Sequence, residues 1–201
     1  GQEERTASLY TIMRSVHEGR GGTVIGEGYF KAKGKNNDPV TGQNEEVTPF
    51  WMYAVQGVEV EVDPGTGEVR VLRMVGASDV GKAINPVGVI QQIQGGMIQG
   101  LSGGMMEDVL LDGKGRIVNA NLADYKMMTT MDMPEQVEAY FTENADPDGP
   151  FGAKGLGEGP VAPGAPALAN AICDAIGVRI YEAPLTPERI LAALEKKEKG
   201  K

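Results

Sequence analysis

Only one cysteine, Cys173, and one histidine, His17, occur in the 201 residues of this chain. A single cysteine excludes an internal disulfide and fits a reducing compartment, so we expect a cytoplasmic protein. Cys173 lies in an apolar helical run and is expected to be a small core residue rather than a nucleophile. Because His17 has no cysteine or histidine partner, a histidine-based zinc site is excluded.

Long hydrophobic runs and basic charge are scarce as well. No apolar segment approaches the ~20 residues that a membrane-spanning helix needs, and no signal peptide is visible at the polar start of the chain. Lys and Arg number 19 against 28 Asp and Glu, which gives a formal net charge of −9. So acidic a chain is not expected to bind nucleic acid or an anionic membrane.

Glycine, in contrast, is abundant, with 29 residues. It is concentrated in the segment 152–160 (GAKGLGEGP), which also carries one carboxylate, Glu158. Glycine lets a backbone approach a ligand closely and adopt positive φ. The position of Glu158 in such a loop is set by the backbone, which suits a general base that faces a bulky cofactor. The alternative interpretation is a mobile surface loop with a solvated acid.

Hydrophobic periodicity predicts short strands and helices in alternation. Helices are expected at residues 7–17, 85–106 and 165–176 and after Thr186, strands at 24–33, 137–143 and 178–181, a hairpin at 58–75, and a strand–turn–strand at 110–118. Asn85 and Thr186 are expected to begin their helices, each with a proline at the first helical position. Alternation without long parallel units indicates an α+β fold rather than a Rossmann sheet.

The helix expected at 85–106 has two distinct faces. Its apolar stripe consists of Ile90, Ile93, Met97, Leu101 and Met105. Gly96, Gly100 and Gly104 lie four apart and therefore share another face, which can press against a second backbone or a flat ligand. Because each helical glycine costs about 1 kcal/mol relative to alanine, we infer that close approach is needed there.

The spacing of residues in the glycine loop argues against a nucleotide-binding motif. Glycines at 152, 155, 157 and 159 do not fit the Gly-x-Gly-x-x-Gly pattern of dinucleotide sites, and Lys154 is not part of a P-loop. The side chain of Lys154 is instead a candidate to turn inward toward Glu158. Asp79 and Asn85 are expected to fix the turn into the following helix rather than to touch substrate.

Five segments occur in a recognisable order: residues 79–86 (DVGKAINP), 91–100 (QQIQGGMIQG), 123–126 (ADYK), 157–160 (GEGP) and 184–189 (PLTPER). Together they resemble the C-terminal part of the molybdopterin-binding subunit of the xanthine dehydrogenase and aldehyde oxidoreductase family. The resemblance runs from about residue 26 to residue 194. It implies two-layer α/β sandwich modules, which we expect at residues 1–110 and 111–201, the second carrying the active-site glutamate.

The resemblance also implies a site and a reaction. Glu158 matches the family's active-site glutamate and is expected to be the general base of a molybdenum hydroxylase, which oxidises an aldehyde or an N-heteroaromatic compound with water-derived oxygen. Gln92, Gly155, Leu156 and Gly157 are expected to contact the cofactor, a molybdopterin in its cytosine dinucleotide form. The dithiolene of the pterin holds molybdenum, so no protein ligand is expected. The alternative is a non-catalytic cofactor-binding or structural subunit.

The chain departs from the family pattern at its N-terminal side. Family subunits carry a long preceding portion with a Gly-Gly-Phe-Gly type cofactor segment and the substrate-gating residues, and neither is found here. We therefore expect a larger molybdopterin-binding chain as partner, with FAD and [2Fe–2S] clusters on flavin and iron–sulfur subunits. Either a split subunit, as in nicotinate dehydrogenase, or a fragment of a longer chain fits this pattern.

Overall fold

The structure is a computed structural model that describes residues 7–17, 25–31 and 34–200. It divides into two compact units, residues 1–31 and 32–201. In the first unit, α1 (Leu9–His17) forms as predicted, and the Ser8 hydroxyl accepts a hydrogen bond from the amide of Thr11 at 3.1 Å. The strand predicted at 24–33 is wrong for residues 25–31, which are irregular; residues 24, 32 and 33 lie outside the described residues.

The second unit is built on a three-stranded sheet in the order β1-β2-β3. The predicted hairpin is confirmed: β1 (Ala54–Val62) and β2 (Val69–Asp79) are antiparallel. β3 (Gln136–Thr142) pairs with β2 in parallel. Two parallel strands need a crossover connection, and α2 (Pro86–Met105) provides it.

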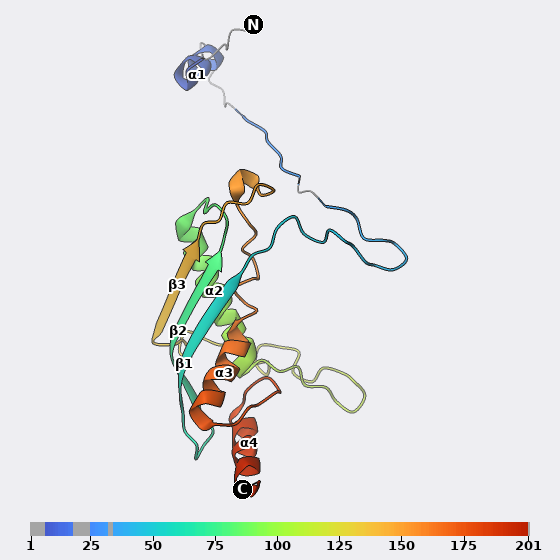
Figure 1. Ribbon diagram of the computed structural model, residues 1–201, viewed down its shortest axis with the longest axis vertical. Coiled ribbons are helices and arrows are strands. Elements are labelled where there is room, and N and C mark those ends of the chain that lie inside the picture. Colours follow the sequence, from blue (N-terminus) through green and yellow to red (C-terminus); the bar gives the residue numbers. More distant parts are fainter. Residues whose placement is uncertain (1–6, 18–24, 32–33, 201) are drawn as a thin grey trace. The chain divides into compact units, whose positions relative to one another are not determined.

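Two helices cover one face of this sheet. α2 packs against β2 and β3, α3 (Gly164–Ile176) packs against β1, and the two helices contact each other (Figure 1). Fully buried core residues come from β2, α2, α3 and α4 (Pro187–Lys199): Met74, Ile93, Met97, Leu101, Leu168 and Ile190. The predicted α+β class with a two-layer sandwich is therefore confirmed. The division into modules at residue 110 stays a prediction.

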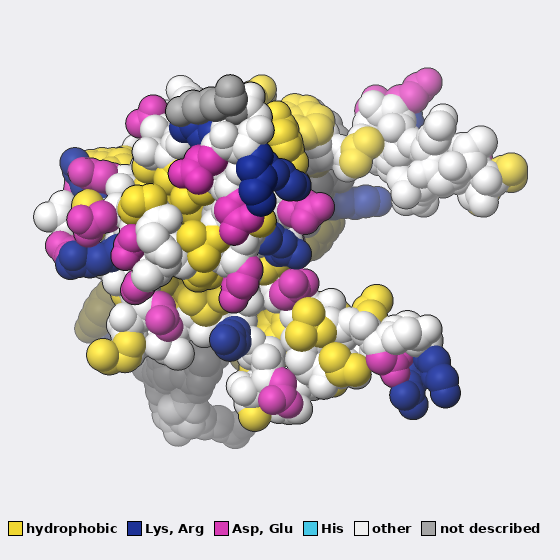
Figure 2. All heavy atoms as spheres, turned by 90° about the horizontal axis from the view of Figure 1, so that it is seen from below, with side chains coloured by type: hydrophobic (Ala, Val, Ile, Leu, Met, Phe, Trp, Pro, Cys, Tyr) yellow, Lys and Arg dark blue, Asp and Glu magenta, His cyan; other side chains and the backbone are white. Residues whose placement is uncertain are grey.

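The outer face of the sheet is charged over β1, β2 and β3. Arg73 donates from Nε to Glu138 at 2.7 Å, and Arg70 pairs with Glu61 at 3.8 Å. The glutamates of the hairpin thus mark a solvated face, as the alternation predicts. Figure 2, a view onto one end of the molecule, shows acidic and basic side chains interspersed. Over the described residues, no helix is both long and apolar enough to cross a membrane.

The glycine face of α2 lies against backbone. A Cβ on Gly96 would come within 2.8 Å of the Cβ of Pro160, and one on Gly104 within 3.0 Å of the Cα of Ala165. At Gly100 the added carbon would overlap the carbonyl oxygen of Val161. The close approach that the glycines predict is therefore real, and what approaches is the segment that connects the glycine loop to α3.

Two strand predictions are wrong. Residues 110–118 form a turn closed by a single bridge between Leu111 and Ile117, and residues 178–181 form no strand. Both segments have alternating apolar residues, but neither has a neighbouring strand with which it could form a ladder of hydrogen bonds. Alternation alone is therefore not sufficient for a strand.

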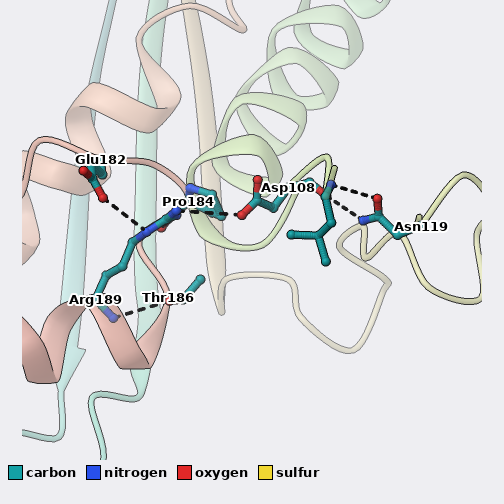
Figure 3. Close-up of polar contacts among 7 residues, drawn as sticks. Asp108, Asn119, Glu182, Pro184, Thr186 and Arg189 are labelled. Carbon is teal, nitrogen blue, oxygen red and sulfur yellow. Dashed lines mark hydrogen bonds and ion pairs between the residues drawn. The ribbon is translucent and has the colours of Figure 1, made fainter. Parts of the chain in front are cut away.

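The C-terminal helix is fixed by its first turn. Thr186 caps α4 by accepting from the amide of Arg189, as predicted. The guanidinium of Arg189 donates to the carbonyl of Pro184 at 2.7 Å and lies 3.8 Å from carboxylate oxygens of both Asp108 and Glu182 (Figure 3). Arg189 therefore ties α4 to the segment that follows α2.

Candidate active site

The glycine loop begins where the turn after β2 pairs with it. Gly81 and Ala153 form an isolated antiparallel bridge, and the amide of Lys82 donates to the carbonyl of Gly152 at 2.7 Å. Gly81 has a φ of 61°, and a Cβ there would overlap the Gly152 carbonyl oxygen. Only glycine allows both this backbone conformation and this approach.

A buried ion pair lies beneath this bridge. The ammonium of Lys154 is 2.7 Å from Oδ2 of Asp79, and the two side chains are only 8% and 11% exposed. Asp79 also accepts from the amides of Gly81 at 3.2 Å and Asn144 at 3.4 Å. Asp79 thus fixes the turn into α2, as predicted. Lys154 is engaged by Asp79, so the alternative in which it turns toward Glu158 is wrong.

Opposing effects act on the Asp79 carboxyl. Burial raises its pKa, while the hydrogen bonds from Lys154 and from the amides of Gly81 and Asn144 lower it. The hydrogen bonds prevail, and the pKa of Asp79 lies below its ordinary value of 3.8. The carboxylate is therefore charged, and the pair stays intact, throughout the neutral range.

The lowered pKa of Asp79 predicts an acid dependence. Its contribution to the free energy of unfolding is complete above pH 3.8, the ordinary value, and is lost as the pH falls through the lower folded-state value. Urea unfolding between about pH 5 and about pH 2 should show a shallower decline for Asp79→Asn than for the unchanged chain. Other carboxylates with lowered pKa values are present in both proteins, so their contributions cancel in the comparison. An equal decline of the free energy of unfolding in both proteins would contradict the prediction.

Beyond Lys154, two glutamines fix the loop. Nε2 of Gln92 donates to the carbonyl of Gly157 at 2.7 Å, and Nε2 of Gln56 donates to the carbonyl of Pro160. The carbonyl oxygen of Gln92 has no partner among the described residues and remains available. Gln92 thus holds the loop through its amide nitrogen, and the same side chain keeps an acceptor for a ligand.

Gln56 is a functional neighbour that sequence reasoning missed. Its side chain lies on the same, inward-facing side of β1 as Val58, Val60 and Val62. Its Oε1 atom is buried and has no hydrogen-bond partner among the described residues. The sequence did contain a signal for this contact, because the amide of Gln56 alternates in step with inward-facing valines. A polar side chain on the core face of a strand needs a hydrogen-bond partner.

Glu158 presents a free carboxylate on this loop. The side chain is exposed and makes no hydrogen bond or ion pair with any residue that the structure describes. Its own carbonyl accepts from the amide of Val161 at 3.0 Å, and the side chain of Met52 packs closely against Gly159. The backbone at Glu158 is thus held while its carboxylate remains available for chemistry.

A cavity of about 390 Å³ lies beside the loop. Of the predicted site residues, Gln92, Leu156 and Gly157 line it, whereas Gly155 and Glu158 do not. The remaining lining is formed by Val80, Lys82, Ile84, Asn85, Gly88, Val89, Ala153 and Lys154. The structure therefore brings three of the five predicted residues to one hollow, with Glu158 one residue beyond its edge.

A second hollow of about 520 Å³ lies away from Glu158, beside Met105 and Tyr125. The hydroxyl of Tyr125 donates to Glu107 at 2.7 Å, and this hydrogen bond raises the pKa of the tyrosine. The contact ties the segment around Tyr125 to the residues that follow α2.

Comparison with known proteins gives a consistent result. The family described as molybdopterin cofactor-binding domain matches residues 2–134. The gamma subunit of the 6-hydroxypseudooxynicotine dehydrogenase complex of Paenarthrobacter nicotinovorans is 40% identical over 170 residues, which are 81% of this chain and 21% of that protein. The putative xanthine dehydrogenase molybdenum-binding subunit of Escherichia coli is 35% identical over 94% of this chain and 23% of that protein.

Solved structures agree with the sequence relatives. The aldehyde oxidoreductase of Desulfovibrio gigas superposes with a TM-score of 0.70 and 35% identity, over 80% of this chain and 17% of that chain. This chain therefore spans about a fifth of the length of the relatives it matches. The family match ends before residue 158, so the role of Glu158 is not part of it.

Proposed function

Because the chain belongs to the family of molybdopterin cofactor-binding domains, we propose that it forms part of a molybdenum hydroxylase with Glu158 as general base. The substrate class is an aldehyde or an N-heteroaromatic compound, which the names of the relatives as aldehyde oxidoreductase and xanthine dehydrogenase support. The observation that carries the proposal is the unpartnered carboxylate of Glu158 on a loop held by Lys154, Gln92 and Gln56.

The residues beside the loop fit an organic cofactor. Gln92 offers an unused carbonyl oxygen, and the Cβ position of Gly157 is open, so a flat molecule can lie against the backbone. Leu156 lines the same cavity, and Gly155 lies next to it in the chain. A bound molybdenum cofactor would supply the two-electron redox centre of the reaction. We propose the cytosine dinucleotide form, with FAD and [2Fe–2S] clusters on partner subunits receiving the electrons.

Glu158 then handles the proton. With the cofactor bound, the carboxylate of Glu158 would accept the proton of the water-derived oxygen that bonds to the electrophilic carbon of the substrate. The cofactor would supply the acceptor for the hydrogen and the two electrons that this carbon gives up. General bases held in position in this way contribute about 100- to 10,000-fold to a rate. Because the backbone on both sides of Glu158 is anchored, the carboxylate reaches the reacting oxygen with little loss of freedom at the moment of reaction.

This chain provides one wall of such a site. Phe151 is 92% exposed at the start of the loop, and Trp51, Tyr53 and Val55 are each about two-thirds exposed where the chain enters β1. A row of exposed large apolar side chains is typical of a surface that another part of a protein covers. We therefore propose that a larger molybdopterin-binding portion covers these residues and completes the pocket around Glu158.

Native purification tests the proposed function. The chain, with whatever co-purifies, is expected to contain stoichiometric molybdenum and pterin together with a larger partner portion, and to oxidise an aldehyde or heteroaromatic substrate. Metal analysis and fluorescence of the oxidised pterin measure the cofactor. A stable, stoichiometric assembly without molybdenum or pterin would contradict the proposal and favour a structural subunit.

A further inference from the structure

We propose that the buried Asp79–Lys154 ion pair positions the glycine loop, so that the carboxylate of Glu158 is correctly placed for the reaction. The inference rests on the proposed role of Glu158 and names two further residues that act through it. Nζ of Lys154 lies 2.7 Å from Oδ2 of Asp79, with both side chains nearly buried. Asp79 is itself fixed by the amides of Gly81 and Asn144, so the anchor is rigid on its strand side.

The stretch from Gly155 to Gly157 depends on anchors at its two ends because its own backbone has few neighbours. A Cβ at Gly157 would meet nothing within 4 Å, and one at Gly155 would meet only the ring of Phe50 at 4.0 Å. Glycine-rich backbone has the largest conformational freedom of any sequence. The ion pair fixes the chain just before this free stretch, and the Gln92 bond fixes Gly157, immediately before Glu158.

A buried ion pair makes this anchor specific for one arrangement of the loop. A buried ion pair adds little stability over well-packed apolar side chains, but a missing partner leaves an unpaired buried charge, so one arrangement is strongly preferred. The pair also engages the only cation within the loop segment 152–160. With Lys154 turned to Asp79, its ammonium does not compete for the Glu158 carboxylate that accepts the proton of the water-derived oxygen.

The test uses the assembled enzyme with Lys154→Met and Asp79→Asn. Since small displacements of a catalytic group cost about 100-fold, each variant is expected to lower kcat by about that factor, with KM nearly unchanged. Hydrogen exchange at the amides of residues 154 and 161, which donate to the carbonyls of Val80 and Glu158, should accelerate in both variants, in cofactor-loaded and cofactor-free samples alike, while α2 and α3 stay protected. Lys154→Arg, which keeps the cation, should recover most of kcat.

Arg73→Met is the matched control, because it breaks an ion pair of the same sheet on the outer, solvated face. It should change neither kcat nor loop exchange. The inference is overturned if Lys154→Met leaves kcat and exchange at the amides of residues 154 and 161 unchanged, or if exchange accelerates equally in α2 and α3, which is the pattern of general destabilisation. If Lys154→Met does not assemble, Asp79→Asn, which preserves side-chain size, decides by the same two measurements.

The exchange measurement separates this inference from the proposed function. It reports where the loop is held and does not depend on what Glu158 does chemically. Retained turnover in Glu158→Gln would refute the general base, whereas unchanged exchange in Lys154→Met would refute the positioning pair.

Discussion

Glu158→Gln is expected to lower kcat of the assembled enzyme by about 100- to 10,000-fold, because the amide has the shape of the carboxylate but cannot accept the proton. Molybdenum content, assembly and KM should change little, since the side chain is exposed and no described residue depends on it. Steady-state kinetics with the preferred substrate, together with metal analysis of the same sample, measure both effects.

The control for this variant is Glu59→Gln, which neutralises an exposed glutamate on the outer face of β1, away from the loop. Its kcat should equal that of the unchanged enzyme, so a loss confined to Glu158→Gln cannot come from net charge. Near-normal turnover of Glu158→Gln would remove Glu158 from the mechanism. Loss of molybdenum in that variant would instead make Glu158 a cofactor-binding residue.

The second large effect is expected at the glycine face of α2. Gly100→Val should lower the free energy of unfolding by about 3 kcal/mol or more, because overpacking of a closed contact forces the backbone to move. The first added carbon already overlaps the carbonyl of Val161 and comes within 3.2 Å of the Cα of Gly164. Urea unfolding followed by circular dichroism measures the change.

Gly103→Ala in the same helix provides the contrast. A Cβ there would meet nothing within 4 Å, so alanine should raise the free energy of unfolding by up to about 1 kcal/mol through helix propensity alone. Opposite signs for Gly100→Val and Gly103→Ala would establish that the contact, not the helix, requires glycine. Destabilisation by both would indicate a different cause.

Local signals in the sequence were sufficient for much of the fold. The caps at Asn85 and Thr186 each depend on a few neighbouring residues, and both were predicted correctly. The alternation in β1 also identified its outer face. The strands expected at 110–118 and 178–181 failed, because a strand depends on a partner that the local pattern does not specify.

The contacts of the candidate site were not predictable from the sequence. Glycine spacing and family resemblance proposed Glu158 and Gln92, and their roles stay predictions. The direction of Lys154 could not be foreseen, because its partner Asp79 is 75 positions away and the pairing exists only once the turn after β2 meets the loop. Gln56 was missed for the same reason, since its contact with Pro160 spans 104 positions.

The three anchors of the glycine loop have a consequence for how the chain folds. They close loops of 65, 75 and 104 residues, for Gln92, Lys154 and Gln56 respectively. Loop-closure entropy grows so slowly that these lengths differ by less than about 0.6 kcal/mol, so none of the anchors is greatly preferred as the first to form. Once one has formed, the others lie a few residues from their partners and close readily. During folding, the segment around Glu158 should therefore become ordered together with the sheet and α2.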